Sequence, residues 1–440
     1  MSNLEIGLTS FPVLLLMIFL RVPIGLSMFI VGLGGLYFVT GGWTVALAKL
    51  KSETYSTFSS YSLSIVPMFL LMGQFATLGG MSTALFKAAE AWLGHRRGGV
   101  AMSAVGACAG FGAICGSSLA TAATMGQVAL PELRRYGYSG GFSTATLAAG
   151  GTLGILIPPS VILVIYAILT EQNIAKLFLA AFIPGILAAI GYMITISIYV
   201  RMNPDSAGIR EPIPYRDRFR ALFNVWPVLL VFLLVVLGIY LGWFTPTEGA
   251  AVGALGTGII AFFNGGLTRV SLSDSFLSTA RSTAMIFFIV LGAGFYNGFL
   301  ALTQVPQELA AWVGQLGYSP WLILSLILVL YLVFGCIMDS LSMILLTIPI
   351  FFPIISALDF GLSAEETAIW FGIIVLIVVE VGLITPPVGM NLFVINSMDR
   401  KTPMLETYKA VMYFVASDII RVVILVAFPV ITLGLLRVLH

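Results

Sequence analysis

Long apolar segments separated by short polar ones run along the whole chain. Stretches of about 20 apolar residues, the length that a helix needs to cross a bilayer, recur from residue 7 to residue 436. The longest polar segment, Arg201 to Asn224, is too short to fold as a separate domain. The pattern predicts an all-α polytopic membrane protein. We expect about ten full spans, near residues 7–20, 23–40, 58–82, 141–168, 177–200, 226–243, 247–265, 281–303, 367–397 and 410–436.

The composition agrees with this and excludes several classes of protein. Of the 440 residues, 59% are hydrophobic and only 9% are charged, with a net charge of +2. A soluble domain carries roughly a quarter charged residues, so a soluble enzyme and a nucleic-acid-binding protein are excluded. Three cysteines in apolar, glycine-rich runs and two histidines, His95 and His440, offer little material for a disulfide, a metal cluster or histidine-based catalysis. The absence of a Walker A pattern excludes ATP hydrolysis by that route.

Lysine and arginine mark the loops that stay in the cytoplasm. Four basic clusters are therefore predicted to be cytoplasmic: Lys87 with Arg96 and Arg97, Arg134 with Arg135, Arg201 to Arg220, and Arg400 with Lys401. The segment 98–133 begins and ends on that side, and it is too short for two spans of about 20 residues with a turn. We predict a re-entrant hairpin here, and two short full spans are the alternative.

The second half has the opposite charge pattern. Residues 282–399 contain no lysine or arginine, so the loops at 303–320 and 358–367 are predicted to be periplasmic. The apolar segment 320–358 between them would be a second hairpin, which enters from outside, and both termini would be periplasmic. The segments 41–55 and 268–279 are too polar to span and could be amphipathic arms at the surface.

Short local matches relate the two halves of the chain. In order, they pair Phe11–Leu15 with Trp226–Leu230, Phe111–Ile114 with Phe334–Ile337, and Gly154–Pro159 with Gly382–Pro387. The second match also pairs Ser117 with Ser340 and Thr124 with Thr347. Each half would contain one hairpin and five full spans, which is an odd number, so the second copy would be inverted in the membrane. Such inverted repeats are typical of secondary transporters.

This repeat predicts how the chain divides into domains. Residues 1–200 form the first repeat, 201–224 a basic cytoplasmic linker, and 225–440 the inverted second repeat. The first repeat contains scaffold spans at 7–82, the hairpin 98–133 and a broken helix at 141–168. The second contains scaffold spans at 226–303, the hairpin 320–358, a broken helix at 367–397 and a last span at 410–436.

The interrupted segments are the best candidates for a binding site. A Pro-Pro pair removes two backbone donors, and the freed carbonyls must find hydrogen-bond partners or line a wet cavity. Gly154–Ser160 and Gly382–Asn391 both carry this pattern near mid-depth, although a kinked structural helix would show it too. The hairpin centres, Gly116–Thr121 and Asp339–Ser342, add hydroxyl, carboxylate and backbone oxygens that suit an alkali cation, although small packing residues are the alternative. No cluster for a proton relay is available, which favours sodium as the coupling ion.

The charges inside the membrane constrain the substrate. Neither hairpin and neither broken helix contains a lysine or arginine, so helix N-termini and bound cations would have to neutralise an anionic substrate. Asp339 is predicted to serve a sodium site. Glu380 is either functional or protonated and packed. Glu248 is predicted to cap a helix, and Asp418 with Arg421 to pair near the end of a span.

The sequence resembles the large membrane subunit of tripartite ATP-independent periplasmic (TRAP) transporters, within the ion transporter superfamily. The segments that carry the resemblance are Arg21–Gly25, Gly116–Ala122, Gly154–Pro159, Phe244–Glu248 and Gly382–Asn391. It implies a bacterial inner-membrane transporter that works by an elevator mechanism. It also implies uptake of a small organic acid, such as a C4-dicarboxylate or sialic acid, driven by sodium. Two partners are implied, a small four-span membrane subunit, which we expect not to be fused to this chain, and a periplasmic solute-binding protein.

The resemblance also implies sodium sites at both hairpin tips. The expected metal ligands are Gly116, Ser117, Ser118, Gly154, Pro158, Asp339, Ser340, Ser342, Gly382, Thr385 and Met390. The residues expected to bind the substrate are Ser117, Ser118, Thr121, Thr385 and Asn391. Competing hypotheses are an ion channel, a symporter that needs no binding protein, and an intramembrane hydrolase, which would lack a histidine at depth.

Overall fold

The computed structural model describes residues 2–439, and within that range the chain is helical without any strand. The first half contains α1 (Asn3–Phe19), α2 (Ile24–Thr40), α3 (Trp43–Phe58), α4 (Ile65–Leu78), α5 (Met81–Leu93), α6 (Gly99–Cys115), α7 (Ser118–Arg135), α8 (Gly140–Leu156), α9 (Val161–Thr170) and α10 (Ile174–Met202). The linker carries α11 (Tyr215–Phe223). The second half contains α12 (Trp226–Tyr240), α13 (Pro246–Phe263), α14 (Arg269–Thr303), α15 (Val305–Gln315), α16 (Pro320–Gly335), α17 (Ser340–Ser356), α18 (Ala364–Leu383), α19 (Met390–Met398), α20 (Met404–Ala427) and α21 (Pro429–Leu439).

Many of these helices are suited to a bilayer. In the described range, five are long and apolar enough to span on their own, and three pairs bent by 52°, 44° and 45° bring the number to eight. Shorter apolar helices, among them α1, α2, α16 and α17, add to these. The chain is therefore a polytopic, all-helical membrane protein, as predicted.

The two halves pack against each other reciprocally. Helix α2 of the first half packs along α14 of the second, and α13 of the second half packs along α4 of the first. The same exchange recurs at the hairpins, where α7 contacts α19 and α17 contacts α9. The α2–α14 crossing is close, because a Cβ on Gly32 would lie only 2.6 Å from the backbone nitrogen of Tyr296. Glycine at this position is thus what lets the two backbones approach.

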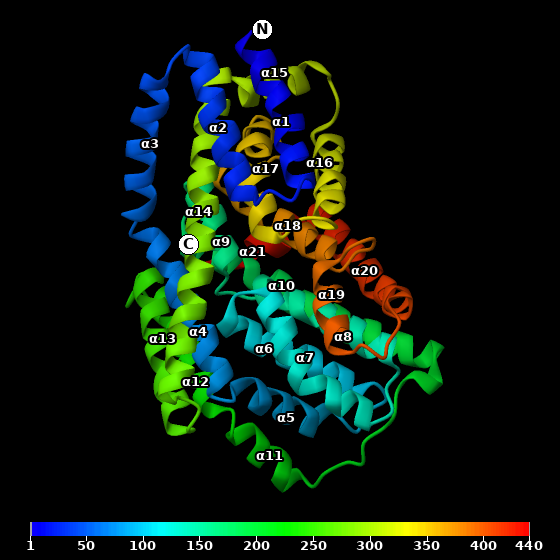
Figure 1. The fold of residues 1–440 in the computed structure, drawn as a ribbon. Helices are drawn as coiled ribbons and strands as arrows, with labels where there is room; N and C mark the ends of the chain where they lie inside the picture. The colour runs from blue at the N-terminus through cyan, green and yellow to red at the C-terminus, as the bar shows by residue number, and fades with distance from the viewer. Residues whose placement is uncertain (1, 440) are drawn as a thin grey trace.

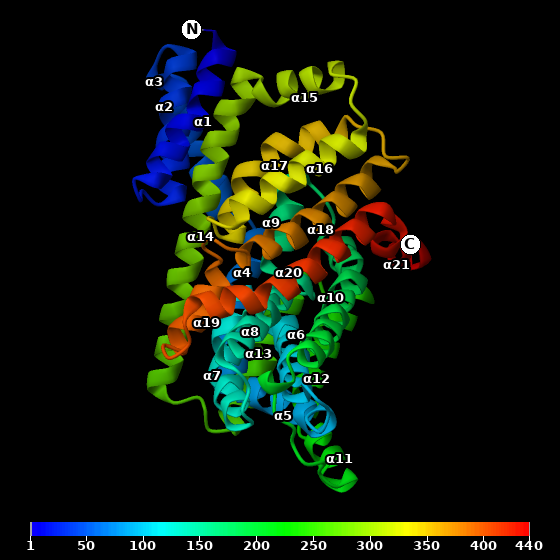
Figure 2. The same ribbon diagram turned by 90° about the vertical axis from the view of Figure 1, so that its right-hand side faces the viewer.

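Two short helices lie across the ends of the molecule. Helix α5 joins α4 to the first hairpin at one end, and α15 joins α14 to the second hairpin at the opposite end (Figures 1 and 2). Their equivalent places fit an inverted repeat. Which end faces the cytoplasm stays a prediction from the basic residues, which places α5 at the cytoplasmic end.

The two segments expected to form surface arms are helical and largely exposed in the structure. Residues 268–279 are the beginning of α14, a single helix of 35 residues, and most of 41–55 belongs to α3, which packs along α14. Two polar side chains of α3 pair with each other at the contact with α14. Lys49 and Glu53 form an ion pair at 2.7 Å and lie over Gly294 and Gly298 of α14, where any Cβ would overlap them. The ion pair is thus partly exposed and packs over two positions of α14 that carry no side chain.

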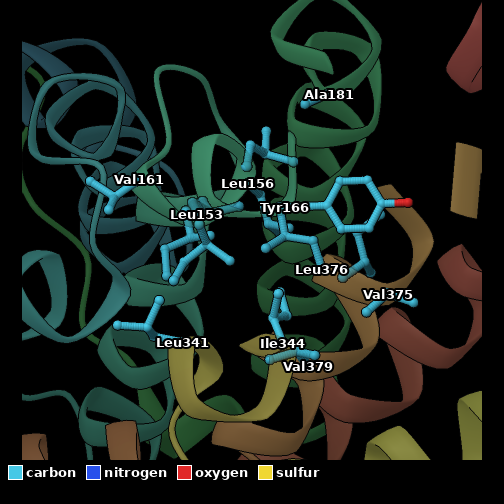
Figure 3. Close-up of a cluster of buried hydrophobic side chains, with 14 of the residues drawn as sticks. Leu153, Leu156, Val161, Tyr166, Ala181, Leu341, Ile344, Val375, Leu376 and Val379 are labelled. Atoms are coloured by element: carbon cyan, nitrogen blue, oxygen red, sulfur yellow. The ribbon is translucent and has the colours of Figure 1, made fainter. Parts of the chain in front are cut away.

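Each half contains a hairpin followed by a broken helix. The first hairpin, α6 and α7, turns at Gly116, whose φ of +64° is in the left-handed region that glycine tolerates. The second, α16 and α17, turns just before Asp339. The broken helices are α8 with α9 and α18 with α19, separated by residues 157–160 and 384–389. Side chains from α8, α9, α10, α17 and α18 form one buried apolar cluster around them (Figure 3).

The end of the chain departs from the single span expected at 410–436. Helix α20 ends at Ala427, and α21 begins at Pro429 and packs against α10 and α18. The Pro429 ring lacks an N–H and cannot continue the helix, so the chain changes direction here. The Trp370 indole donates a 3.1 Å hydrogen bond to the Leu425 carbonyl, which the interrupted helix leaves free.

Candidate functional site

Three helices begin around one cavity at the centre of the molecule. The Ser117 hydroxyl accepts from the Ala120 N–H at the start of α7, and the Asp339 carboxylate accepts from the Ser342 N–H at the start of α17. The Ser160 hydroxyl caps α9 in the same way. Because helix N-termini carry a partial positive charge, three of them at one place favour an anion.

The cavity has a volume of about 390 Å³ and lies between the hairpin tips and the scaffold. One wall contains residues 116–120 of the first hairpin and Asp339–Leu341 of the second. The opposite wall comes from α4, with Gln74 and Thr77, and from α14, with Ser282. No lysine or arginine is among the described residues that line it. An anion in this cavity would therefore meet hydroxyl groups, helix N-termini and any bound cation.

The first group of predicted sodium ligands is brought together. Gly154 lies against the Ser117 carbonyl and the Thr121 hydroxyl, both of which a Cβ at Gly154 would overlap or crowd. Gly116 faces the Pro159 carbonyl, 3.1 Å from an ideal Cβ. The Thr121 Oγ1 is buried and has no hydrogen-bond partner among the described residues. Carbonyl and hydroxyl oxygens thus gather where the first broken helix meets the first hairpin.

The second group has a related arrangement. Gly382 packs against Gly335, so that a Cβ on Gly382 would lie 2.5 Å from the Gly335 Cα. The Gly389 N–H donates a 3.4 Å hydrogen bond to the Cys336 carbonyl. The buried Ser342 Oγ has no partner in the described range. Residues 2–439 contain no cluster of three or more histidine, cysteine or acidic side chains that could hold a metal ion. A cation here would rely on hydroxyl and carbonyl oxygens with Asp339.

Two of the five predicted substrate-binding residues line the cavity. Ser117 and Ser118 line the cavity, whereas Thr121, Thr385 and Asn391 do not. The Thr385 hydroxyl donates to the Val381 carbonyl at 2.6 Å, and the Asn391 amide donates to the Ala148 carbonyl at 3.3 Å. Of the remaining predicted ligands, Ser340 lines the cavity, and Pro158 and Met390 lie outside its lining. Roles in binding stay predictions for all of them.

Glu380 lies between the two hairpins. It is 1% exposed, and its Oε1 accepts a 2.7 Å hydrogen bond from the Ser340 hydroxyl. The Ser118 hydroxyl of the other hairpin also reaches this carboxyl group. Its Oε2 has no partner in the hydrogen-bond geometry of the described residues. Glu380 therefore bonds to the tip of the second hairpin and lies near Ser118 of the first, without itself lining the cavity.

The scaffold wall of the cavity was not predicted. Gln74, Thr77 and Ser282 form it, and no motif in the sequence marked them as site residues. A signal for Gln74 existed, because it is a lone amide within the apolar segment 65–78. For the hydroxyl residues no such signal is available, since serine and threonine also serve as small packing residues in membrane helices.

Comparisons with known proteins identify the family. The model of the DctM component of tripartite ATP-independent periplasmic transporters matches residues 11–431. The chain belongs to this family. A similar protein is the C4-dicarboxylate TRAP transporter large permease protein DctM of Pseudomonas aeruginosa, 37% identical over 89% of this chain and 90% of that protein.

Other relatives in the DctM family carry different substrates in their names. The sialic acid TRAP transporter permease protein SiaT of Haemophilus influenzae is 32% identical over 94% of this chain and 66% of its own length. The ectoine TRAP transporter large permease protein TeaC of Halomonas elongata is 30% identical over 91% of this chain and 92% of its own. Relatives are named as transporter permeases and not as enzymes.

A solved structure shares the fold. The YdaH transporter of Alcanivorax borkumensis, described as having an unusual topology, aligns with a TM-score of 0.61 over 88% of this chain and 89% of its own. The sequence identity is 13%, so this likeness concerns the fold alone.

Proposed function

We propose that this permease takes up a small organic acid together with sodium, and that it receives the acid from a periplasmic binding protein. The supporting observation is the cavity itself. Three helix N-termini and the oxygen-rich hairpin tips surround it, and no basic side chain from residues 2–439 lines it. A carboxylate there needs cations beside it, and the groups around Thr121 and Ser342 offer oxygen ligands without other partners. Cation binding and anion binding would thus depend on each other.

We further propose that the hairpins and broken helices move as one unit against α2, α4, α13 and α14. The cavity lies at the boundary between the two groups, and α5 and α15 connect them at opposite ends. This arrangement supports an elevator movement, in which the moving unit carries the cavity between the two sides. The bacterial inner membrane is the location that a periplasmic partner requires.

The relatives supply the substrate classes to test. Their names mention C4-dicarboxylates, sialic acid and ectoine, and the first two are carboxylates of the kind that the cavity favours. A small membrane subunit and a binding protein are the partners that the tripartite family implies.

The test is uptake into proteoliposomes that contain this chain with its small membrane subunit. Radiolabelled succinate, sialic acid and ectoine are each supplied with the purified binding protein, under an inward sodium gradient. We expect saturable uptake of one acid, and none when potassium replaces sodium. Uptake without the binding protein would instead identify an independent symporter, and flux that does not saturate would identify a channel.

A further inference from the structure

The central cavity is asymmetric with respect to the two hairpins. Along α7 its lining extends from Ser117 to Thr124, which is about 10 Å of helix. Along α17 the lining stops at Leu341, within the first turn. The cavity lining therefore reaches further along α7 than along α17. Helix α7 contacts α5, which lies at one end of the molecule (Figure 1).

A pair of residues related by the internal repeat shows the same difference. Thr124 on α7 corresponds to Thr347 on α17 in the sequence alignment of the halves. Thr347 is 3% exposed, and its hydroxyl donates a 2.7 Å hydrogen bond to Tyr331 of α16. Thr124 is half-buried and lines the cavity. At this position the second hairpin is closely packed, whereas Thr124 of the first hairpin lines the cavity.

The scaffold wall opposite α7 carries polar side chains among apolar ones. Gln74 is held in place by a 3.3 Å hydrogen bond from its Nε2 to the Ser278 hydroxyl of α14. This leaves its amide oxygen and one N–H free to contact a solute. Thr77 follows one turn later on α4, and Ser282 lies one turn from Ser278 on α14. Gln74 and Ser282 can donate hydrogen bonds to an anion, whereas the Thr77 hydroxyl already donates to the Gly73 carbonyl at 3.0 Å. None of these side chains carries a positive charge that would retain the anion.

The path continues beyond the cavity on α7. At 100° per residue, Ala120, Thr124 and Gln127 lie on one face of this helix. Gln127 is exposed, and Arg135 ends the helix with a largely exposed side chain. The Gln127 amide thus follows Thr124 towards the predicted cytoplasmic end, where Arg135 forms an ion pair with Glu132 at 3.5 Å.

We propose that the substrate is released between α4 and α7, past Gln74, Thr77 and Thr124, towards the end that carries α5. This inference rests on the proposed transport function, and it adds the route and the side chains that the departing anion contacts. It also assigns Gln74 a part in transport on the scaffold side, although it belongs to neither hairpin.

Accessibility tests the route without relying on transport. In the complete complex, with Cys108, Cys115 and Cys336 replaced by alanine, Thr124→Cys and Thr77→Cys are exposed to a membrane-impermeant maleimide. We expect labelling in inside-out vesicles and its loss in right-side-out vesicles. Thr347→Cys is the matched control and should remain unlabelled in both. Labelling of Thr124→Cys from outside, or from neither side, would overturn the route.

Transport tests the role of Gln74. Gln74→Glu has nearly the same shape and can still accept a hydrogen bond from Ser278, but it places a negative charge on the route. We expect this variant to lose most sodium-driven uptake, and Gln74→Leu to lose less. Uptake by Gln74→Glu equal to that of the unsubstituted complex would refute the assignment. Failure of the unsubstituted complex to transport would instead refute the proposed function, and the labelling pattern would still report the route.

Discussion

The Ser340 hydroxyl donates a 2.7 Å hydrogen bond to the Glu380 carboxyl group and so joins the tip of the second hairpin to the second broken helix. Both residues are buried, with 5% and 1% of their surfaces exposed. A hydrogen bond between buried groups matters mostly through the cost of leaving one partner unpaired.

The stability lost when Glu380 is replaced should therefore depend on whether the new side chain can still accept a hydrogen bond from Ser340. Glu380→Ala leaves the Ser340 hydroxyl unpaired and opens a cavity, so we expect it to cost about 1–3 kcal/mol of unfolding free energy. Glu380→Gln keeps an oxygen that can accept from Ser340 and should cost less. Thermal unfolding of the purified protein measures the difference, and equal losses for both variants would contradict this role.

Asp339 caps a helix and is the one acidic side chain among the described residues that line the cavity. Asp339→Asn keeps an oxygen for the Ser342 N–H but removes the charge, so stability should change little while sodium binds more weakly. We expect a higher sodium concentration for half-maximal uptake. Asp359→Asn is a matched control, because Asp359 also accepts from a backbone N–H, that of Gly361, in an exposed loop. A sodium requirement that is unchanged by Asp339→Asn would remove Asp339 from the ion site.

The contact between Gly335 and Gly382 leaves no room for a methyl group. Gly382→Ala would place its Cβ 2.5 Å from the Gly335 Cα. Because backbone cannot move aside cheaply, we expect a loss of about 1–3 kcal/mol of unfolding free energy and reduced uptake. Gly34→Ala is the control, since no atom lies within 4 Å of a Cβ at that helical position. It should leave stability equal or slightly higher, and a similar loss in both variants would argue against the close approach.

The ion pair between Glu90 of α5 and Arg210 of the linker gives a prediction on pH. Its partners are 3.0 Å apart, yet burial raises the pKa of the Glu90 carboxyl above its ordinary value of 4.5 in spite of the attraction of Arg210. The folded state thus holds the Glu90 proton more tightly than the unfolded state. The stability that this group contributes is present below its unfolded pKa and is lost as pH rises through its folded pKa.

Glu90→Gln should therefore be more stable than the unsubstituted protein at neutral pH. The advantage should shrink as the pH is lowered towards 4.5 and below, where Glu90 itself is protonated. Thermal unfolding across this pH range measures it. Lower stability of Glu90→Gln at pH 7 would show that the ion pair outweighs the cost of burying the carboxylate.

Local chemistry explains what the sequence could predict of the fold. Apolar length indicated the spans, and the Pro-Pro pairs marked the two interruptions at 157–160 and 384–389. The hairpin turns at Gly116 and Asp339 followed from small and polar residues within apolar segments. Each of these signals depends on a few neighbouring residues, and so it could be read without knowing what packs against them.

The features that were missed depend on distant contacts. The polarity of 41–55 indicated a segment at the surface, but it did not indicate that Lys49 and Glu53 pair with each other over Gly294 and Gly298 of α14. Likewise, Gln74 and Ser282 form one wall of the cavity only because α4 and α14 of different halves lie together. Sequence patterns within either segment cannot show that meeting.

The reciprocal packing of the halves has a consequence for biosynthesis. Helix α2 is synthesised early, but the groove that receives it, on α14, leaves the ribosome more than 200 residues later. Until then the glycine face of α2 can contact only lipid or another protein segment that later gives way to α14. Assembly of the scaffold must therefore be a late event, completed after both halves have been inserted, and neither half on its own carries the surfaces needed to finish it.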